Sequence, residues 1–316
     1  MVVVVVHGGA GAWLKDRLAR ALEGVVRAAE EGFKILKGGG SALDAVEAAV
    51  MVMEDDPIFN AGVGSSLNLA GEVEAEASIM DGSTLAAGAV ALVKDVRHPV
   101  KLARLVMEET DHVLLTGPTA EKLADIFGLE KAELKTPERV KLWEHWLGEL
   151  KAGRARYYVK LPELMRSYPD LAPGTVGALA LDGEGRLAAA TSTGGLMLKL
   201  PGRLGDSSQI GAGTYADAFG ACSATGIGEV AIKLGLARMA CLFMRVGLSA
   251  PEAAQACMGL VLQAFPGTPM GVITLDASGK VGAAHTSRSM PWAYMRDEMD
   301  KPEASEKGVL VGKGLV

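Results

Sequence analysis

The spacing of apolar residues changes several times along the chain, and each spacing predicts a different element. The run Val2–Val6 is short and uninterrupted, which is typical of a strand buried on both faces. Helical spacing follows over roughly residues 16–37 and ends at three glycines. Ser41 and Asp44 then form a variant of the capping box, which predicts a second helix. Further along, we expect strands near 78–80 and 87–93 and helices near 100–110 and 119–127.

From Thr175 onward the pattern becomes alternating. Small and apolar residues alternate over 175–182, turn through Gly183-Glu184-Gly185, and return over 186–193, which predicts a β-hairpin. Antiparallel hairpins joined by helices predict the α+β class, with sheets that helices cover. The remaining elements expected here are a second hairpin over 271–285 and helices at about 229–246 and 251–265.

Residues from about 130 to 174 differ from the segments on either side. Charged residues crowd together there, and the aromatic residues among them are Trp143, Trp146, Tyr157 and Tyr158. We interpret this stretch as a partly helical connector on the surface. An ordinary helical insertion is the alternative that the sequence leaves open.

Composition narrows the class of protein. A chain of 316 residues, 49% hydrophobic with 40 glycines, is typical of one large folded domain or two ordinary ones. The net charge of −6 and the lack of a basic run exclude a nucleic-acid binder. No apolar stretch approaches the roughly 20 residues of a membrane-spanning helix.

The cysteines and the first residues bear on the compartment. The three cysteines match no zinc pattern and lie in apolar stretches, so buried free thiols are expected at Cys222, Cys241 and Cys257. The chain begins with no basic segment and no signal-peptide core. We therefore expect a cytoplasmic protein.

Hydroxyl groups gather on the hairpin that begins at Thr175. A three-residue loop places Thr175 opposite Thr193 on the same side of the sheet, and a two-residue loop places it opposite Ser192 instead. Threonine is common in strands, so this pairing alone decides little. Pro173-Gly174 precedes Thr175, which puts a stiff residue and then a permissive one before the hydroxyl.

Two further groups could bind a substrate. Arg203 and Asp206 are three residues apart beside glycines, and an arginine can hold a carboxylate through two hydrogen bonds while an aspartate holds an ammonium. This pair would bind the two charged groups of an amino acid. Thr225 and the Gly226 amide, just before an expected helix, could donate hydrogen bonds to an oxyanion.

These segments together resemble the plant-type asparaginases, also called isoaspartyl peptidases, which are N-terminal-nucleophile hydrolases. The motifs occur in the family's order and span nearly the whole chain outside the connector. They are His7-Gly8-Gly9-Ala10-Gly11, Phe59-Asn60-Ala61-Gly62-Val63-Gly64, Met80-Asp81-Gly82, Gly88-Ala89-Val90-Ala91, Gly174-Thr175-Val176-Gly177-Ala178, Thr191-Ser192-Thr193-Gly194-Gly195, Pro201-Gly202-Arg203-Leu204-Gly205-Asp206-Ser207, Gly211-Ala212-Gly213-Thr214-Tyr215-Ala216 and Thr225-Gly226-Ile227-Gly228-Glu229.

The resemblance implies a four-layer αββα sandwich and self-cleavage of the Gly174–Thr175 bond. Residues 1–174 and 175–316 would then be two fragments of one structural domain, and two such pairs would form a homodimer. The substrates implied are L-asparagine and β-aspartyl dipeptides, with no organic cofactor.

The resemblance also implies a role for each matching residue. Thr175 would be the nucleophile, Thr193 would assist it, and Thr225 with the Gly226 amide would form the oxyanion hole. Arg203 would bind the substrate carboxylate, while Asp206 and the Gly228 carbonyl would bind its amino group. Asn60 corresponds to a residue near the nucleophile. A structural sodium ion would be held by backbone carbonyls of Met53, Glu54, Phe59, Ala61 and Val63.

Two positions depart from the family pattern. Glu76 stands where relatives commonly have aspartate, and His285-Thr286-Ser287-Arg288 replaces a more usual asparagine–threonine stretch. We expect both to line the leaving-group side of the site, so they leave the preferred leaving group open.

The mechanism explains why the threonine must become N-terminal. A threonine hydroxyl is a weak nucleophile until a base removes its proton, and a free α-amino group with a pKa near 8 can be that base. Cleavage before Thr175 would therefore create nucleophile and base together.

Other interpretations fit less well. A glycosylasparaginase would usually be secreted with disulfides, and a threonine endopeptidase of the same fold is a further alternative. A dinucleotide-binding protein is suggested by Gly211-x-Gly213-x-x-Ala216, but no clear strand leads into that segment. A catalytically inactive binding relative is disfavoured because the expected site residues are all present.

Overall fold

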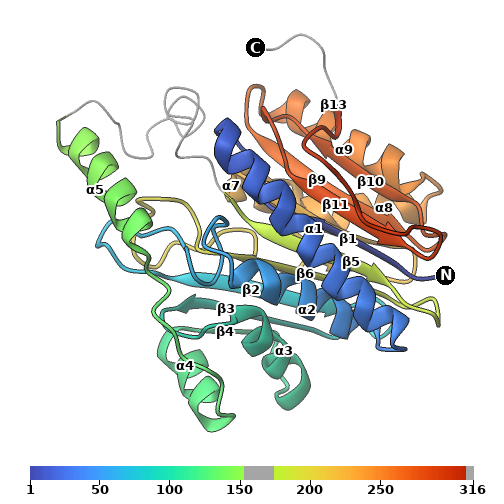
Figure 1. The fold of residues 1–316 in the computed structure, drawn as a ribbon, viewed down its shortest axis with the longest axis horizontal. Helices are drawn as coiled ribbons and strands as arrows, with labels where there is room; N and C mark the ends of the chain where they lie inside the picture. The colour runs from blue at the N-terminus through green and yellow to red at the C-terminus, as the bar shows by residue number, and fades with distance from the viewer. Residues whose placement is uncertain (153–173, 311–316) are drawn as a thin grey trace.

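The computed structural model of the chain describes residues 1–152 and 174–310 (Figure 1). The described part is of the mixed α+β class that the sequence predicts, with two β-sheets and helices packed against them. The expected connector lies partly outside the described residues, including Tyr157 and Tyr158, as does the end of the expected C-terminal fragment.

The larger sheet has eight strands in the order β12-β11-β1-β5-β6-β2-β3-β4, so strands from both halves of the chain alternate within it. All neighbours are antiparallel except β3 and β4. Its strands are β1 (Val3–His7), β2 (Ala75–Asp81), β3 (Ala87–Val93), β4 (Leu114–Thr116), β5 (Val176–Leu181), β6 (Leu187–Thr193), β11 (Trp292–Arg296) and β12 (Glu303–Ser305).

The smaller sheet has five strands in the order β13-β10-β9-β8-β7. An apolar cluster that includes Val5, Leu179, Ile273 and Leu275 joins its inner face to that of the larger sheet. Its strands are β7 (Thr214–Ala216), β8 (Gly220–Gly226), β9 (Met270–Asp276), β10 (Val281–His285) and β13 (Val309–Leu310).

Helices pack on the other face of each sheet, as Figure 1 shows for α1 and α2 on the larger sheet. A second apolar cluster buries α8 and α9 against the smaller sheet. The helices are α1 (Lys15–Lys37), α2 (Ala42–Glu54), α3 (Pro99–Glu109), α4 (Gly117–Ile126), α5 (Pro137–Lys151), α7 (Gly228–Leu234), α8 (Leu236–Arg245) and α9 (Ala250–Ala264).

Local signals placed most helix ends correctly. Both capping boxes form: the Ser41 hydroxyl accepts from the Asp44 amide before α2, and Ser249 pairs with Glu252 before α9. The single helix expected over 229–246 is wrong. Gly235 adopts a left-handed conformation, with φ of 56°, and separates α7 from α8.

The connector segment has one helix, α5, within the described residues, and it lies at the edge of the molecule (Figure 1). Trp146 is buried, and the Trp143 indole donates to the Asn68 carbonyl at 2.9 Å. The helix is therefore attached to the rest of the fold through its tryptophans, although most of its other side chains face solvent at least in part.

The register of the central hairpin agrees with a three-residue loop. Leu181 pairs with Leu187 and Val176 with Ser192, so the next residues outward are Thr175 and Thr193. The alternative in which Thr175 faces Ser192 is wrong. The hydroxyl of Ser192 instead donates to the buried carboxyl of Glu54, at 2.6 Å from Oε1.

Glu54 makes the stability of the fold depend on pH. Complete burial raises its pKa to about 8, and its Oε2 has no hydrogen-bond partner among the described residues. Glu54 is therefore protonated in the folded protein at neutral pH, whereas in the unfolded chain it titrates near 4.5. Between these values only the folded state holds the proton, so the free energy of unfolding falls as pH rises.

We expect Glu54→Gln to remove this dependence, because an amide does not titrate. The Tm of Glu54→Gln minus that of the unmodified protein should increase between pH 5 and pH 8, measured by thermal unfolding at one protein concentration. The control is Glu30→Gln, an exposed position on α1. Parallel Tm curves for Glu54→Gln and the unmodified protein would contradict the buried, protonated carboxyl.

Candidate active site

The hydroxyl pair predicted from the hairpin forms at the edge of β5 and β6. Thr175 immediately precedes β5 and Thr193 ends β6, and both are buried. The Thr175 hydroxyl donates to the Thr193 Oγ1 at 3.4 Å, and that oxygen also accepts from the Gly195 amide at 3.0 Å. Thr193 Oγ1 is therefore the acceptor toward which the Thr175 hydroxyl points, at the long end of the hydrogen-bond range.

The peptide bond before Thr175 is held between two other motifs. The Asn60 amide donates to the Gly174 carbonyl at 3.1 Å. Gly9, with φ of 108°, approaches so closely that a Cβ there would lie 2.7 Å from the Gly174 Cα. The Asn60 side chain donates to the Gly195 carbonyl, which ties this contact to the strand end that carries Thr193. These contacts put Asn60 beside the Gly174–Thr175 bond, and its role in the site stays a prediction.

Arg203, Asp206 and Gly228 come together beside the hydroxyl pair. Gly228 starts α7, and a Cβ on it would lie 2.9 Å from both Arg203 Nη2 and Asp206 Oδ1. Arg203 binds the Glu229 carboxylate through Nε and Nη2, each at 2.9 Å. This second carboxylate, which the sequence analysis did not use, fixes the plane of the guanidinium.

Asp206 is a buried carboxyl whose own contacts are incomplete. Burial raises its pKa to about 7, against the opposing influence of Arg203. Its Oδ2 has no hydrogen-bond partner within the described residues. An unsatisfied buried oxygen is costly, and a cationic donor such as an ammonium would both pair it and favour its ionised form.

Thr225 and Gly226 lie at the end of β8, before the start of α7. The Thr225 Oγ1 accepts from the Ala10 amide at 3.1 Å, which leaves its hydroxyl hydrogen to donate elsewhere. Gly226 has φ of 131°, and a Cβ on it would lie 2.5 Å from the Pro269 carbonyl oxygen. Only glycine fits this position.

Most of the predicted residues line one narrow cleft of about 10 Å³. Thr225 is completely buried beneath its neighbours, and it is not among the lining residues. A much larger cavity of about 370 Å³ has Gly174, the residue before Thr175, in its lining. The residues that line the narrow cleft are Thr175, Thr193, Gly195, Leu196, Arg203, Gly205, Asp206, Gly226 and Gly228.

Glu76 does not lie on the side of the site where it was expected. Its carboxylate accepts from the Gly205 amide at 2.8 Å and from the Ser208 hydroxyl at 2.9 Å, so it supports the turn that carries Arg203 and Asp206. The completely buried Lys199 lies 3.3 Å from Glu76 and neutralises it. Glu76 lines neither cavity, because its carboxylate is used inside the fold.

His285 also lines neither cavity. Its ring is buried, and Nδ1 lies 3.0 Å from the Ser287 carbonyl oxygen. Burial lowers the pKa of His285 below its ordinary value, so the ring is neutral at physiological pH. Sequence alone could not place Glu76, Lys199 or His285, although a lysine between Leu198 and Leu200 was a signal of a buried charge.

The loop expected to hold sodium contains a cation of the protein itself. The Phe59 carbonyl accepts from Arg139 Nη2 at 2.8 Å, and Arg139 Nε donates to the Gly64 carbonyl. The Glu54 carbonyl accepts from the Val63 amide at 2.7 Å. Burial and the neighbouring Arg17 lower the pKa of Arg139 to about 10, so it stays charged at neutral pH. One of the five expected carbonyls therefore already accepts from a guanidinium and another from a backbone amide, and each carbonyl oxygen keeps a second acceptor site.

The remaining predictions about buried groups and membranes can be compared directly. The three cysteines are free and buried, which confirms that expectation. Among the described residues, no helix is both long and apolar enough to cross a membrane. No cluster of three or more His, Cys, Asp or Glu side chains in the same residues is placed to hold a metal ion.

Comparison with known proteins identifies the family to which this fold and site belong. A family model described as asparaginase matches residues 1–303, and the chain belongs to this family. A plant-type L-asparaginase of Pyrococcus horikoshii is 48% identical over 305 residues, 96% of this chain and 99% of the relative. A plant-type L-asparaginase of Thermococcus kodakarensis is 49% identical over 306 residues, with the same coverage of each chain. An isoaspartyl peptidase/L-asparaginase of Homo sapiens is 46% identical over 300 residues, 93% of each chain.

Arg139 leads to a prediction about sodium. Because its guanidinium already supplies positive charge to the loop carbonyls, the Tm should be the same in sodium chloride as in choline chloride of equal concentration. Arg139→Met should lower stability by about 1–3 kcal/mol, since buried carbonyls lose charged donors. The control is Arg20→Met, at an exposed position on α1. A lower Tm of the unmodified protein in choline chloride would show that sodium binds.

Proposed function

We propose that this protein is an autoprocessing threonine hydrolase that cleaves the side-chain amide of L-asparagine and of β-aspartyl dipeptides. One observation carries the proposal: the Thr175 hydroxyl is directed by Thr193 at 3.4 Å, next to the charged pair Arg203 and Asp206. The relatives' names support it, since they are called L-asparaginase and isoaspartyl peptidase/L-asparaginase.

The proposed self-cleavage uses groups already in place around Gly174. The Thr175 Oγ1 attacks the Gly174 carbonyl carbon while the Asn60 amide, 3.1 Å from the carbonyl oxygen, stabilises the negative charge. The C–N bond breaks, its nitrogen takes up a proton and becomes the α-amine of Thr175, and Gly174 is left as an ester on Oγ1. Water hydrolyses the ester, which gives a Gly174 carboxylate and restores the hydroxyl.

In turnover the new α-amine accepts the proton of the Thr175 hydroxyl. The hydroxyl oxygen attacks the side-chain carbonyl of the substrate, and Thr225 and the Gly226 amide donate to the oxyanion. The hydrogen bond from Ala10 to Thr225 supports this role, because it leaves the hydroxyl hydrogen as the free donor. Ammonia or an amino acid leaves with a proton, and water releases aspartate. This chemistry needs no organic cofactor.

Recognition of the aspartyl half is assigned to Arg203, Asp206 and Gly228. Arg203 would bind the α-carboxylate, and Asp206 with the Gly228 carbonyl would bind the α-ammonium. The Oδ2 of Asp206, which has no hydrogen-bond partner in the described part of the chain, supports the second contact. Glutamine has one more methylene, so its carbonyl would overshoot a hydroxyl fixed at the strand edge, and a misplacement of about 1 Å can cost on the order of 100-fold in rate.

Cleavage would leave one structural domain made of two fragments, 1–174 and 175–316. Strand order supports this, because β5 and β6 of the second fragment lie between β1 and β2 of the first. The three apolar clusters support a four-layer αββα sandwich of the N-terminal-nucleophile type, with one cluster between the sheets and one beneath each helical layer.

We propose that pairs of fragments assemble as a homodimer. Support comes from the exposed apolar side chains Leu242 and Val246 on and just beyond α8, with Phe219 nearby under the Arg245 guanidinium.

The buried free cysteines favour a cytoplasmic location, where thiols stay reduced.

Self-cleavage is directly testable. The purified protein should show the masses of residues 1–174 and 175–316 without added protease, whereas Thr175→Ala should remain one chain because it lacks the attacking hydroxyl. The control is Ser192→Ala. Ser192 precedes Thr193 and its hydroxyl contacts Glu54, so this variant should still cleave itself. Fragments that begin anywhere other than Thr175 would refute the assignment.

The pKa of Asp206 predicts how product binding depends on pH. Only the ionised carboxylate attracts an ammonium, and the Asp206 pKa of about 7 means that the carboxylate becomes protonated as pH falls below 7. The Kd for L-aspartate, measured by calorimetry on the cleaved protein, should therefore rise up to about tenfold per pH unit between pH 7 and pH 5.5. Asp206→Asn should bind weakly and show no such slope. A constant Kd over this range in the unmodified protein would contradict the ammonium-binding role.

A further inference from the structure

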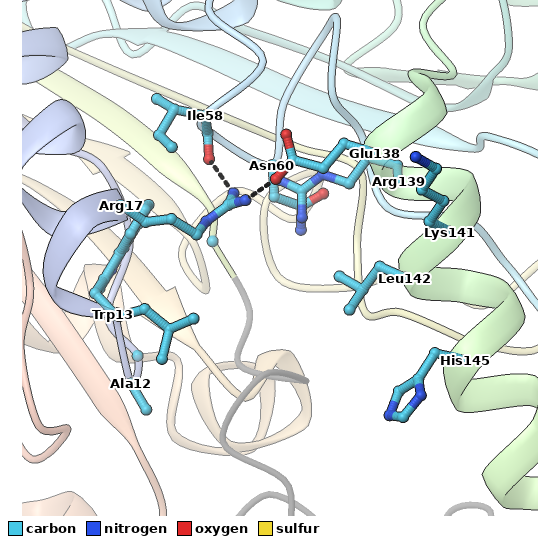
Figure 2. Close-up of a pocket in the computed structure, with 13 residues that line it drawn as sticks. Ala12, Trp13, Arg17, Ile58, Asn60, Glu138, Arg139, Lys141, Leu142 and His145 are labelled. Carbon is cyan, nitrogen blue, oxygen red and sulfur yellow. Dashed lines mark hydrogen bonds and ion pairs between the residues drawn. The ribbon is translucent and has the colours of Figure 1, made fainter.

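The cavity of about 370 Å³ next to Gly174 is not used by the mechanism described so far (Figure 2). It lies between the start of α1, the 57–60 turn and α5. Part of its wall is apolar, with Trp13, Ile58 and Leu142. The cavity therefore offers an apolar surface that a side chain of a substrate could contact.

The charged residues of this cavity favour an anion. Three cationic side chains line it, Arg17, Arg139 and Lys141, against one carboxylate, Glu138. Arg139 already donates hydrogen bonds to the Phe59 and Gly64 carbonyls. Arg17 pairs with Glu138 and donates to the Ile58 carbonyl at 3.1 Å, while Lys141 is exposed on α5. Figure 2 shows Arg17 extending from α1 toward Asn60 and Glu138.

The position of the cavity relative to Thr175 assigns it to one part of the substrate. Thr175 lines the narrow cleft with Arg203 and Asp206, whereas Gly174 lines the large cavity, so one peptide bond joins the two spaces. A carbonyl carbon bound at the Thr175 hydroxyl has three substituents. On the proposed function, the aspartyl chain would extend toward Arg203 and Asp206, and the oxygen toward Thr225 and Gly226. The remaining substituent, the leaving nitrogen, faces the side where Gly174 lies.

Arg17 and Gly174 line the same cavity, and two hydrogen bonds to neighbouring backbone groups connect them. Its Nη2 is 3.1 Å from the Ile58 carbonyl, and Asn60, two residues later, contacts the Gly174 carbonyl at 3.1 Å. Two residues span at most about 7 Å. The Arg17 Nη2 is therefore at most about 13 Å from the Gly174 carbonyl oxygen, and a leaving amino acid would extend its carboxylate from the scissile nitrogen by about one residue length into the cavity that both residues line.

We propose that this cavity is the leaving-group site, in which Arg17 and Lys141 bind the α-carboxylate of the amino acid released from a β-aspartyl dipeptide. The proposal rests on the proposed function. Trp13 and Leu142 would contact the side chain of that amino acid, which favours an apolar residue such as leucine. Asparagine releases ammonia, which has no carboxylate to reach these cations, so the cavity would separate the two substrate classes.

The experiment compares three substrates on the matured enzyme: L-asparagine, β-aspartyl-leucine, and β-aspartyl-leucine amide, which lacks the terminal charge. The variants are Arg17→Gln, which keeps a donor for the Ile58 carbonyl, and Lys141→Gln. Arg20→Gln is the matched control, exposed on the same helix as Arg17 and outside the cavity. Intact mass first establishes that every variant has cleaved itself.

We expect the ratio of kcat/KM for β-aspartyl-leucine to that for asparagine to fall about 10-fold in each variant, because a charge-assisted hydrogen bond is lost. The same ratio for the amide should be low in the unmodified enzyme and should not fall further. Glu138→Gln should raise the dipeptide ratio, since it removes the carboxylate that competes for Arg17. Arg20→Gln should leave all ratios as they are.

Several results would overturn the proposal. One is an equal effect of Arg17→Gln and Lys141→Gln on asparagine and on the dipeptide, and another is no effect on either. Equal hydrolysis of the dipeptide and its amide by the unmodified enzyme would show that the carboxylate is not recognised. Activity on asparagine with none on the dipeptide would refute the leaving-group site but not the nucleophile. Failure to hydrolyse either substrate would instead refute the proposed function itself.

Discussion

The hydrogen-bonded ladder of β1, β5, β6 and β2 is the constraint on which the rest of the structure depends. Strands β5 and β6 lie between two strands from the first half of the chain, so neither half can complete its backbone hydrogen bonds alone. A cut at Gly174–Thr175 lies just outside β5 and breaks none of these pairs. The same ladder brings Thr175 opposite Thr193 and brings the His7–Gly11 segment beside Gly174. The strand pairs that hold the larger sheet together therefore also position Thr175, the candidate nucleophile.

Buried polar groups position the site around this ladder. Glu76 and Lys199 compensate each other inside the fold, and Glu76 also accepts the Gly205 amide, so the turn with Arg203 and Asp206 is anchored from below. Glu229 orients Arg203 in a similar way. Asp206 differs, because one of its oxygens has no partner within the described residues and burial disfavours its charge. A buried oxygen without a hydrogen-bond partner gains more free energy than a paired one when a cation binds to it.

The cavity that Gly174 lines and the cleft that Thr175 lines differ in size and in charge. The narrow cleft has one arginine and one aspartate, which suits a zwitterionic head group of fixed geometry. The larger cavity has several cations and an apolar wall, which suits an anionic group with a variable side chain. On the proposed function, the narrow cleft would select the aspartyl half of the substrate, and the larger cavity would select among leaving groups. This division explains how one hydroxyl could accept leaving groups as different as ammonia and an amino acid.

The sequence by itself determined what local interactions control. Apolar periodicity located the main strands and helices, both capping boxes formed, and the glycine loop set the hairpin register that pairs Thr175 with Thr193. Collinear motifs placed Arg203, Asp206 and Gly228 in one site, and these residues do meet there. The break at Gly235 was missed because helical periodicity continues across it.

Only the tertiary structure decided which charges face one another across distant segments. Glu76 turned inward to Gly205 and Lys199, which are more than a hundred residues away in the chain. Arg139 of α5 reached the carbonyls of a loop about 80 residues earlier, where a sodium ion had been expected. Arg17 and Lys141 met at one cavity for the same reason. Such contacts depend on how helices and strands pack against one another, and the spacing of residues along the sequence does not predict that packing.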